Sequence, residues 1–317
     1  MTRFSLRILK GLFGTLEYVA PSLAGSMAFR LFCRTPNPAR LTDKEKRVLA
    51  LSRDFMRGAR KHPLTTEHGD VVAYEFTNWG GRRDGPAVLV LHGWRSRTEH
   101  MRVIVEALLK RGFRVVSLDL PGHGASGGRT LNIPKAVAAV NAVAQWFGPF
   151  DAMVGHSFGG AVAVNAIAGS VAGVPPVPAR RLVSIAAPNA LPDLFSRFGR
   201  FAGLGPASQK AFEGCVEKIA GAPVNAFVGA QQLQDLEIPT LVVHAPEDKE
   251  VSASDARALA GSGAHVSLVW APGFGHRRIL ADPGIAARVA AFVSTRQERR
   301  LEGETARTLE DCLPNVD

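Results

Sequence analysis

Apolar and polar residues follow a regular order between residues 86 and 296. Short continuous apolar runs are typical of strands buried on both faces of a parallel sheet, and apolar residues recurring every three or four positions mark one face of a helix. The runs predict strands at residues 86–91, 113–119, 152–154, 181–187, 240–245 and 265–270. The segments between them predict helices at residues 98–111, 133–147, 158–171, 253–260 and 279–296. Alternating strands and helices predict an α/β fold with a doubly wound, mostly parallel sheet.

The segments before residue 86 have other patterns. Residues 6–31 predict an amphipathic helix that breaks or kinks at Pro21. Its apolar face comprises Leu6, Leu9, Phe13, Leu16, Ala20, Leu23, Met27 and Leu31. Residues 43–61 predict a solvated helix, and residues 68–79 alternate as a strand that turns at Gly80-Gly81. The inner side of the 43–61 helix would be formed by Val48, Leu49, Leu51 and Phe55.

Residues 188–237 interrupt the alternation and predict two or three short helices that form a small cap. Five phenylalanines are expected to bury this cap against the body, or alternatively to line an acyl-binding tunnel. They are Phe195, Phe198, Phe201, Phe212 and Phe227. The predicted organisation is a basic helical arm (1–61), a first core part (62–187), the cap (188–237), a second core part (238–296) and a flexible polar tail (297–317).

Composition indicates a globular protein with a sizeable core, since 46% of the 317 residues are hydrophobic and 21% are charged. The net charge is +10, and residues 1–61 alone carry thirteen Lys or Arg against four Asp or Glu. A nearly neutral body argues against a nucleic-acid-binding protein. The three cysteines, Cys33, Cys215 and Cys312, lack C-x-x-C spacing, which favours reduced thiols in the cytoplasm and no metal site.

Two interpretations of the N-terminal arm stay open. The arm packs on the body, or residues 1–35 form a basic amphipathic helix that contacts the inner face of a membrane. Residues 11–29 lack Lys and Arg, but Glu17 and Pro21 make them a poor transmembrane span and a poor signal peptide.

The sequence Gly155-His156-Ser157-Phe158-Gly159 joins a predicted strand to a predicted helix. This is the pattern of a nucleophile elbow, in which a serine on a strained turn stands clear of the backbone. A Cβ atom at Gly155 or Gly159 would collide with the adjoining strand or helix. Two further motifs also follow predicted strands: His92-Gly93-Trp94, and Gly275-His276 with the residues Arg277-Arg278-Ile279-Leu280 after it.

Over residues 65–296 these motifs resemble the serine-hydrolase branch of the α/β-hydrolase superfamily, in particular bacterial esterase and monoglyceride-lipase-like members. The resemblance implies Ser157 as nucleophile, His276 as base, and backbone N–H groups of Trp94 and Phe158 as the oxyanion hole. Asp248, three residues before Val251, matches the superfamily's acid. Glu247 is the alternative acid, and Asp193 is a weaker one.

The resemblance also implies secondary roles for other residues. His92 would shape the oxyanion loop, and His123 and His156 would hold their loops. The loop Gly122–Ser126 resembles one near the superfamily's active site, although a tight turn is an equal explanation. Four arginines flank the motif loops, as exposed charges or as groups that favour anionic esters. They are Arg95, Arg97, Arg277 and Arg278.

The expected function is hydrolysis of small-molecule carboxylic esters, including lipid-like ones, by two-step acyl transfer without cofactor or metal. Superfamily members that carry Asp at the elbow, dehalogenases and epoxide hydrolases, are disfavoured by Ser157. The alternatives are a C–C bond or thioester hydrolase, a perhydrolase with the same triad, or a non-catalytic binding module. The sequence indicates no oligomeric state and no acyl length.

Overall fold

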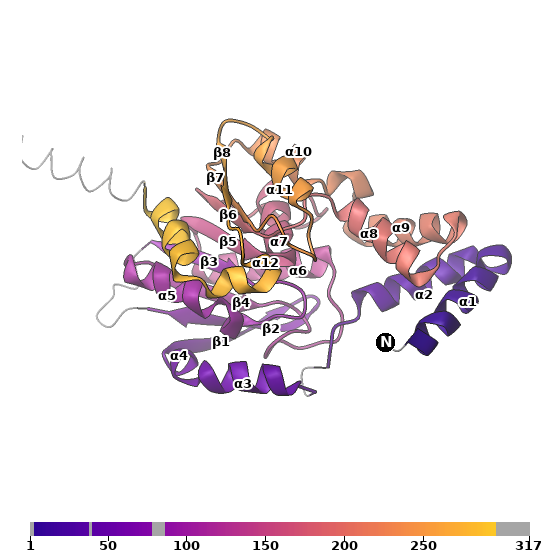
Figure 1. Cartoon of the computed structure of the whole chain (residues 1–317), viewed down its shortest axis with the longest axis horizontal. Coiled ribbons are helices and arrows are strands. Elements are labelled where there is room, and N and C mark those ends of the chain that lie inside the picture. Colours follow the sequence, from indigo (N-terminus) through magenta and orange to yellow (C-terminus); the bar gives the residue numbers. More distant parts are fainter. Residues whose placement is uncertain (1–2, 38–39, 78–85, 296–317) are drawn as a thin grey trace, which may run out of the picture.

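A computed structural model describes residues 3–37, 40–77 and 86–295, and its centre is one eight-stranded sheet (Figure 1). The strands are β1 Ala59–Thr66, β2 Gly69–Phe76, β3 Ala87–Leu91, β4 Arg114–Asp119, β5 Ala152–His156, β6 Leu182–Ile185, β7 Thr240–His244 and β8 Val266–Trp270. Their spatial order is β1-β2-β4-β3-β5-β6-β7-β8. The pairs from β4–β3 to β7–β8 are parallel, whereas β1–β2 and β2–β4 are antiparallel. The mostly parallel sheet is therefore confirmed.

Helices cover both faces of the sheet. Helices α6 (Ile133–Phe147) and α7 (Phe158–Ala168) pack on the face that carries Leu89 and Leu91 of β3. Helix α5 (Arg102–Lys110), which follows the short helix η1 (Thr98–Met101), packs with helix 283–295 on the opposite face. Because successive side chains of a strand point to opposite faces, a continuous apolar run supplies both cores. The sheet is thus doubly wound, as the alternation predicts.

Most predicted elements of the core have the observed bounds within a few residues. Helix α6 begins where Asn132 Oδ1 accepts the N–H of Lys135, and α11 spans Ala253–Ala260. The helix expected over residues 279–296 is divided. The short helices α12 (Gly275–Arg278) and η3 (Ile279–Ala281) come first, and Asp282 Oδ1 then accepts the N–H of Ile285 near the start of helix 283–295.

The single helix predicted over residues 43–61 is wrong. A capping box between Thr42 and Glu45 starts α3 (Asp43–Leu51), which is followed by α4 (Arg53–Arg57). Leu51, expected on the inner side, is 71% exposed. Strand β1 then begins at Ala59 and was missed, because it is an edge strand with a polar sequence and contains Pro63. The predicted turn at Gly80-Gly81 lies outside the described residues.

The N-terminal arm is a pair of helices, α1 (Arg3–Val19) and α2 (Pro21–Cys33), separated at Ala20. Pro21 breaks the predicted helix, since it occupies the first turn of α2. The packing face of α2 differs from the predicted one. Leu23 is 54% exposed, whereas Ala24, Gly25 and Ala28 are buried. These small residues allow close approach to α9, because a Cβ at Gly25 would lie 2.6 Å from the Cβ of Ala211.

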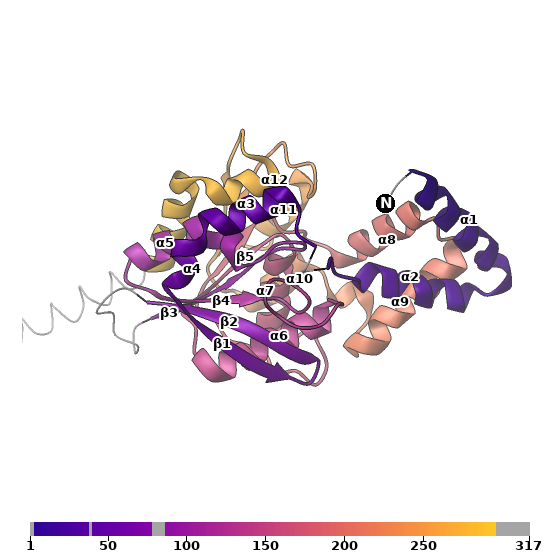
Figure 2. The same cartoon turned by 90° about the horizontal axis from the view of Figure 1, so that it is seen from below.

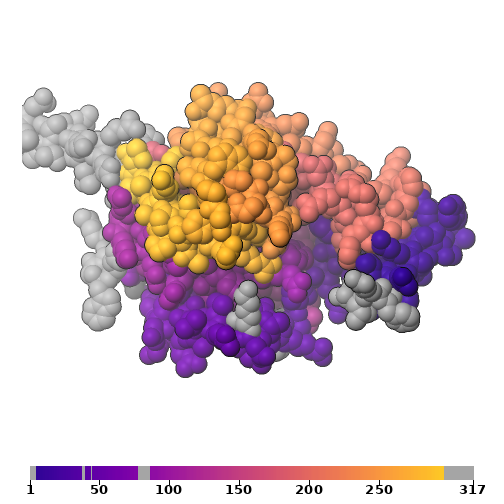
Figure 3. All heavy atoms as spheres, viewed as in Figure 1, coloured from indigo at the N-terminus to yellow at the C-terminus, as the bar shows by residue number. Residues whose placement is uncertain are grey.

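The cap comprises α8 (Leu191–Ala202), α9 (Pro206–Ala220), η2 (Val224–Ala226) and α10 (Gly229–Leu236). Figures 1 and 2 show α8 and α9 beside α1 and α2 in a lobe that projects from the sheet domain. Phe32 of α2 makes edge-to-face contacts with Phe195, Phe198 and Phe212, at centroid distances of 5.1–5.6 Å. The cap phenylalanines therefore pack against the arm rather than only against the body, and Phe201 is half exposed. Figure 3 shows the arm and cap in contact at one end of the molecule.

A carboxylate of the arm accepts hydrogen bonds at the N-terminus of a helix in the cap. Glu17 accepts the backbone N–H groups of Ala207 (2.8 Å) and Ser208 (2.9 Å) in the first turn of α9. The N-cap residue of α9, Gly205, has no side chain to do this, and a Cβ there would lie 2.3 Å from the Glu17 carboxyl carbon. Among the described residues, no helix is both long and apolar enough to cross a membrane.

Candidate functional site

Ser157 lies on a strained turn between β5 and α7. Its φ of +53° and ψ of −125° are conformations that residues with a side chain rarely adopt. A Cβ at Gly155 would lie 2.4 Å from the carbonyl oxygen of Gly159, and a Cβ at Gly159 would lie 2.4 Å from that of Leu91. Only glycine fits at both positions, which is the close approach that the elbow pattern predicts.

Ser157, His276 and Asp248 form one chain of hydrogen bonds. His276 Nδ1 lies 2.7 Å from Asp248 Oδ2, and His276 Nε2 lies 3.0 Å from Ser157 Oγ. Since an ionised carboxylate can only accept hydrogen bonds, His276 donates a hydrogen bond from Nδ1 to Asp248. Its Nε2 then accepts a hydrogen bond from the Ser157 hydroxyl. The three residues come from the segments that follow β5, β7 and β8, so the carboxyl edge of the parallel strands brings them together.

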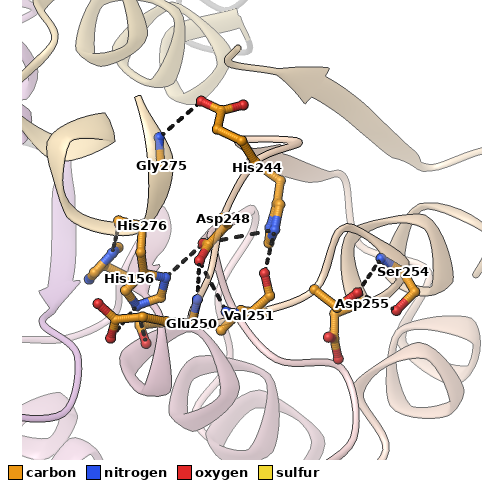
Figure 4. A network of polar contacts seen from close by, with 12 residues as sticks. His156, His244, Asp248, Glu250, Val251, Ser254, Asp255, Gly275 and His276 are labelled. Atoms are coloured by element: carbon orange, nitrogen blue, oxygen red, sulfur yellow. Dashed lines mark hydrogen bonds and ion pairs between the residues drawn. The ribbon is translucent and has the colours of Figure 1, made fainter. Parts of the chain in front are cut away.

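The side chain of Asp248 is buried, and both of its oxygens are hydrogen-bonded (Figure 4). Its Oδ1 accepts the N–H groups of Glu250 (2.8 Å) and Val251 (3.0 Å), while Oδ2 faces His276. Burial alone raises the pKa of this carboxyl, but the hydrogen bonds from His276, Val251 and Glu250 outweigh it and hold the pKa below its usual value. Asp248 is therefore ionised at neutral pH and orients the His276 ring.

His156, beside the serine, holds the backbone of His276. Its Nε2 donates to the carbonyl oxygen of His276 at 2.8 Å, and the two rings are 4.9 Å apart. Burial first, and then the neighbouring His276, lowers the pKa of His156 to about 3. His156 is thus a neutral donor that joins the elbow to the loop after β8.

The His92-Gly93-Trp94 loop lies directly against the elbow. A Cβ at Gly93 would lie 2.9 Å from the Ser157 Cβ, and the Trp94 and Phe158 rings meet edge to face at 5.8 Å. No described residue accepts a hydrogen bond from the backbone N–H of Trp94 or Phe158. Within the part of the chain that the structure describes, both N–H groups are therefore without a protein acceptor.

Buried side chains fix this loop to the rest of the sheet. His92 bonds the carbonyl oxygen of Gly93 through Nδ1 (2.8 Å) and accepts the N–H of Leu120 at Nε2 (3.0 Å). His123 accepts the N–H of Arg95 (3.0 Å), which joins the loop at residues 122–126 to the residues after Trp94.

Asp119, at the end of β4, supports the same region. Its carboxylate accepts the N–H groups of Thr98 (2.9 Å) and Ala125 (2.8 Å). Burial, and then the charge of Glu99, raises the pKa of Asp119 to about 6. A Cβ at Gly124 would lie 1.9 Å from its Oδ2, so only glycine fits this turn.

Three further charged candidates, Glu247, Asp193 and Arg97, are not bonded to the His276 ring. Glu247 accepts the N–H of Gly275 at 3.2 Å, next to His276 but not on its ring. Asp193 lies in the first turn of α8 and, within the described part of the chain, neither bonds nor pairs with His276. Arg97 pairs with Glu99 at 2.8 Å and is only 17% exposed, so it is not a surface charge.

The arginines after His276 are also engaged. Arg278 donates to the carbonyl oxygens of Phe274 and Gly273 (both 3.0 Å), and Arg277 pairs with Glu250 (3.1 Å). Glu250 itself comes within 3.8 Å of His276 Nε2. The sequence alone assigns no role to Glu250, whose one signal is its place two residues after Asp248. Over residues 3–37, 40–77 and 86–295, no cluster of His, Cys, Asp and Glu is arranged to hold a metal ion.

The fold agrees with comparisons to known proteins. The sequence model described as "Alpha/beta hydrolase family" matches residues 88–289. The chain therefore belongs to the alpha/beta hydrolase family, in agreement with the resemblance carried by its motifs.

Three known proteins illustrate the similarity. A bifunctional esterase/perhydrolase of Acinetobacter calcoaceticus is 28% identical over 265 residues, which cover 67% of this chain and 92% of that protein. A pimeloyl-acyl-carrier-protein methyl ester esterase of Xanthomonas campestris is 38% identical over 86 residues, 26% of this chain and 32% of that protein. The structure of Est1E from Butyrivibrio proteoclasticus, which contains ferulic acid, superposes with a TM-score of 0.60 at 20% identity, covering 75% of this chain and 98% of the other. The names of these relatives indicate ester hydrolysis as the activity at the level of the family.

Proposed function

We propose that this protein is a serine hydrolase that cleaves carboxylic esters, with Ser157 as the nucleophile. The observation that carries the proposal is the continuous hydrogen-bond chain from Ser157 Oγ through His276 to the ionised Asp248. A serine hydroxyl is inert at its ordinary acidity and needs such a base within reach.

The proposed reaction has two acyl-transfer steps. Ser157 Oγ attacks the ester carbonyl carbon while its proton moves to His276 Nε2, and Asp248 stabilises the imidazolium that forms. The N–H groups of Trp94 and Phe158 bind the oxyanion, and each such donor is worth roughly 3 kcal/mol in the transition state. His276 then protonates the leaving alcohol, and water activated by the same ring releases the acid and restores the serine.

Labelling by a fluorophosphonate probe tests the nucleophile. We expect wild type to label and to hydrolyse p-nitrophenyl esters, and Ser157→Ala to do neither while keeping its circular dichroism spectrum. Ser254→Ala, which removes an exposed serine hydroxyl from the start of α11, is the matched control and should label like wild type. A folded wild type that neither labels nor hydrolyses any ester of the series would refute the proposal and favour a binding module.

Perhydrolysis is a second candidate, because the relative of 28% identity is named a bifunctional esterase/perhydrolase. In that reaction hydrogen peroxide replaces water in the second step, and a peracid leaves in place of the acid. Peracid formed from an ester and hydrogen peroxide, absent in Ser157→Ala, would support it. Ester hydrolysis without any peracid would exclude it.

Peripheral contact with an anionic membrane is a separate proposal for the arm. Its two helices expose several large apolar side chains: Ile8, Leu12, Tyr18, Val19, Leu23 and Met27. The basic residues Arg7, Lys10 and Arg30 of the same helices are also exposed, and their charge complements anionic headgroups. Other residues of the arm, among them Phe32 and Glu17, contact the cap, so both interpretations of the arm are compatible with one structure.

Cosedimentation with vesicles tests this contact without removing the arm. We expect wild type to bind vesicles rich in phosphatidylglycerol, and the double variant Ile8→Ser, Leu12→Ser to bind several times more weakly. Trp146→Ser, which removes an exposed aromatic ring from α6, is the control and should bind as wild type does. Binding that is unchanged in the double variant, or absent in wild type, would refute membrane contact through this surface.

A further inference from the structure

A second carboxylate lies at the reacting end of the His276 ring. Glu250 Oε2 is 3.8 Å from His276 Nε2, the same nitrogen that lies 3.0 Å from Ser157 Oγ. Asp248, in contrast, contacts Nδ1 on the opposite side of the ring. Figure 4 shows Asp248 and Glu250 approaching His276 from the same loop.

The position of Glu250 is fixed at its backbone and at its carboxylate. Its N–H donates to Asp248 Oδ1 at 2.8 Å, so the residue is tied to the candidate acid. Arg277 Nε and Nη2 hold the carboxylate oxygens at 3.1 and 3.4 Å, and Arg197 of α8 donates to the Glu250 carbonyl oxygen at 3.4 Å. The side chain is half exposed, so its carboxylate lies at the protein surface beside the His276 ring.

This charge is close to the group that leaves in the proposed reaction. His276 Nε2 passes its proton to the leaving oxygen across a hydrogen bond of about 3 Å. A carboxylate at 3.8 Å from the same nitrogen is therefore within about 7 Å of that oxygen. At such distances near a protein surface, an anionic substituent on the alcohol is repelled and a cationic one is attracted.

We propose that Glu250 determines specificity by disfavouring esters with an anionic alcohol part and favouring neutral or cationic ones, an inference that rests on the proposed ester hydrolysis. Each of the two arginines after His276 has partners of its own. Arg277 is paired with Glu250 itself, and Arg278 is bonded to two backbone carbonyl oxygens. The carboxylate is thus the end of the Glu250–Arg277 pair that contacts the reacting nitrogen.

Three acetate esters of meta-substituted phenols test the preference. They are 3-(trimethylammonio)phenyl acetate, its uncharged isostere 3-tert-butylphenyl acetate, and the anionic 3-acetoxybenzoate. The readout is the ratio of kcat/KM values between esters, compared between variants so that the intrinsic reactivity of each ester cancels. In Glu250→Gln we expect the anionic-to-neutral ratio to rise and the cationic-to-neutral ratio to fall, each about three- to tenfold.

Two further variants separate charge from structure. Glu106→Gln removes the same charge from an exposed Glu–Arg pair on α5 and should leave both ratios unchanged. Arg277→Gln leaves Glu250 unpaired and should lower the anionic-to-neutral ratio, but it should have no such effect in the Glu250→Gln background. If Arg277 itself attracted anions, its replacement would lower the ratio equally in both backgrounds, which would overturn the proposal.

Labelling distinguishes the failure of this inference from the failure of the proposed function. In one outcome, wild type labels with a neutral fluorophosphonate and hydrolyses the neutral ester, but Glu250→Gln changes kcat/KM for all three esters by the same factor. That outcome overturns only the specificity role. A wild type that neither labels nor turns over any ester overturns the proposed hydrolase, and the specificity role with it. Ratios that shift as expected and weaken with added salt support the role.

Discussion

At the scale of single residues, the elbow depends on glycines that have no room for a methyl group. Ser157 occupies a left-handed conformation, which costs a residue with a side chain on the order of 1 kcal/mol or more. The surrounding backbone enforces it, because Gly159 rests on the end of β3 and Gly155 rests on the start of α7. The strain holds the hydroxyl toward His276.

Replacing one of these glycines tests the close packing. Gly159→Ala places a Cβ 2.4–2.5 Å from the carbonyl oxygens of Leu91 and His92, and backbone atoms cannot rotate aside. We expect the free energy of unfolding to fall by about 2–4 kcal/mol, measured by urea denaturation. A Cβ at Gly214 of α9 would meet no atom within 4 Å, so Gly214→Ala should instead raise the free energy of unfolding by roughly 0.5–1 kcal/mol. Equal effects of the two substitutions would contradict the argument.

Asp248 and Glu247 are adjacent in sequence, yet their contacts with the site differ. Asp248→Asn keeps the size of the side chain but removes the charge that stabilises the His276 imidazolium. We expect kcat on a p-nitrophenyl ester to fall roughly a thousandfold to ten-thousandfold with the fold retained. Glu247→Gln alters only the partner of the Gly275 N–H, so it should lower kcat on the same ester less than tenfold. The reverse order of effects would identify Glu247 as the acid.

At the scale of elements, α9 obtains its N-terminal cap from another part of the chain. The first turn of a helix has N–H groups without helical partners, and a carboxylate there is stabilised by hydrogen bonds and by the helix dipole. The pKa of Glu17 is lowered most by the Ser208 hydroxyl. The backbone N–H groups of Ser208 and Ala207 lower it further. Glu17 thus fixes α1 on α9 as an ionised group.

The lowered pKa sets the pH range in which this cap acts. A carboxyl whose pKa is lower in the folded state contributes stability above its unfolded pKa, and the contribution disappears as the pH falls through the folded pKa. We expect Glu17→Gln to lower the thermal midpoint at pH 7 and to approach wild type below about pH 4. Glu106→Gln should show no comparable difference. A midpoint difference that persists at low pH would contradict an electrostatic cap.

At the scale of the whole molecule, the arm and the cap share one apolar core. Phe212 of α9 is fully buried and contacts Phe29 and Phe32 of the arm as well as Phe195 and Phe198 of α8. The lobe that Figure 2 shows beside the sheet is therefore built from segments about 180 residues apart in the chain. Its two parts cannot pack independently of each other.

Opening of this lobe should be cooperative. Phe212→Ala removes the ring at its centre, and truncation of a buried phenylalanine costs about 3–5 kcal/mol. We expect hydrogen exchange to speed up together in α1, α2, α8 and α9, with little change in the central strands. Phe201→Ala, at a half-exposed position on the same lobe, is the control and should change exchange little. Unchanged protection of the arm in Phe212→Ala would show that the two parts are separate.

Local patterns predicted the parallel part of the sheet domain well, because the elements of that part carry their own signals. The buried strands are continuous apolar runs, and α6 and α11 have amphipathic periods and caps of their own. The edge strand β1 lacked such a signal, since it is polar, contains Pro63 and is stabilised by pairing with β2. The packing face of α2 was mispredicted because close approach to α9 selects small residues over larger apolar ones.

The sequence by itself determined the doubly wound sheet and the loops that carry Ser157, Asp248 and His276, since strand period, turn glycines and chain order are local properties. Only the tertiary structure decided what depends on distances between segments far apart in the chain. It placed Glu250 beside the reacting nitrogen of His276, paired Arg277 with Glu250, and joined Glu17 to α9. A charge acts according to its distance from other groups, and the order of residues along a chain does not specify that distance.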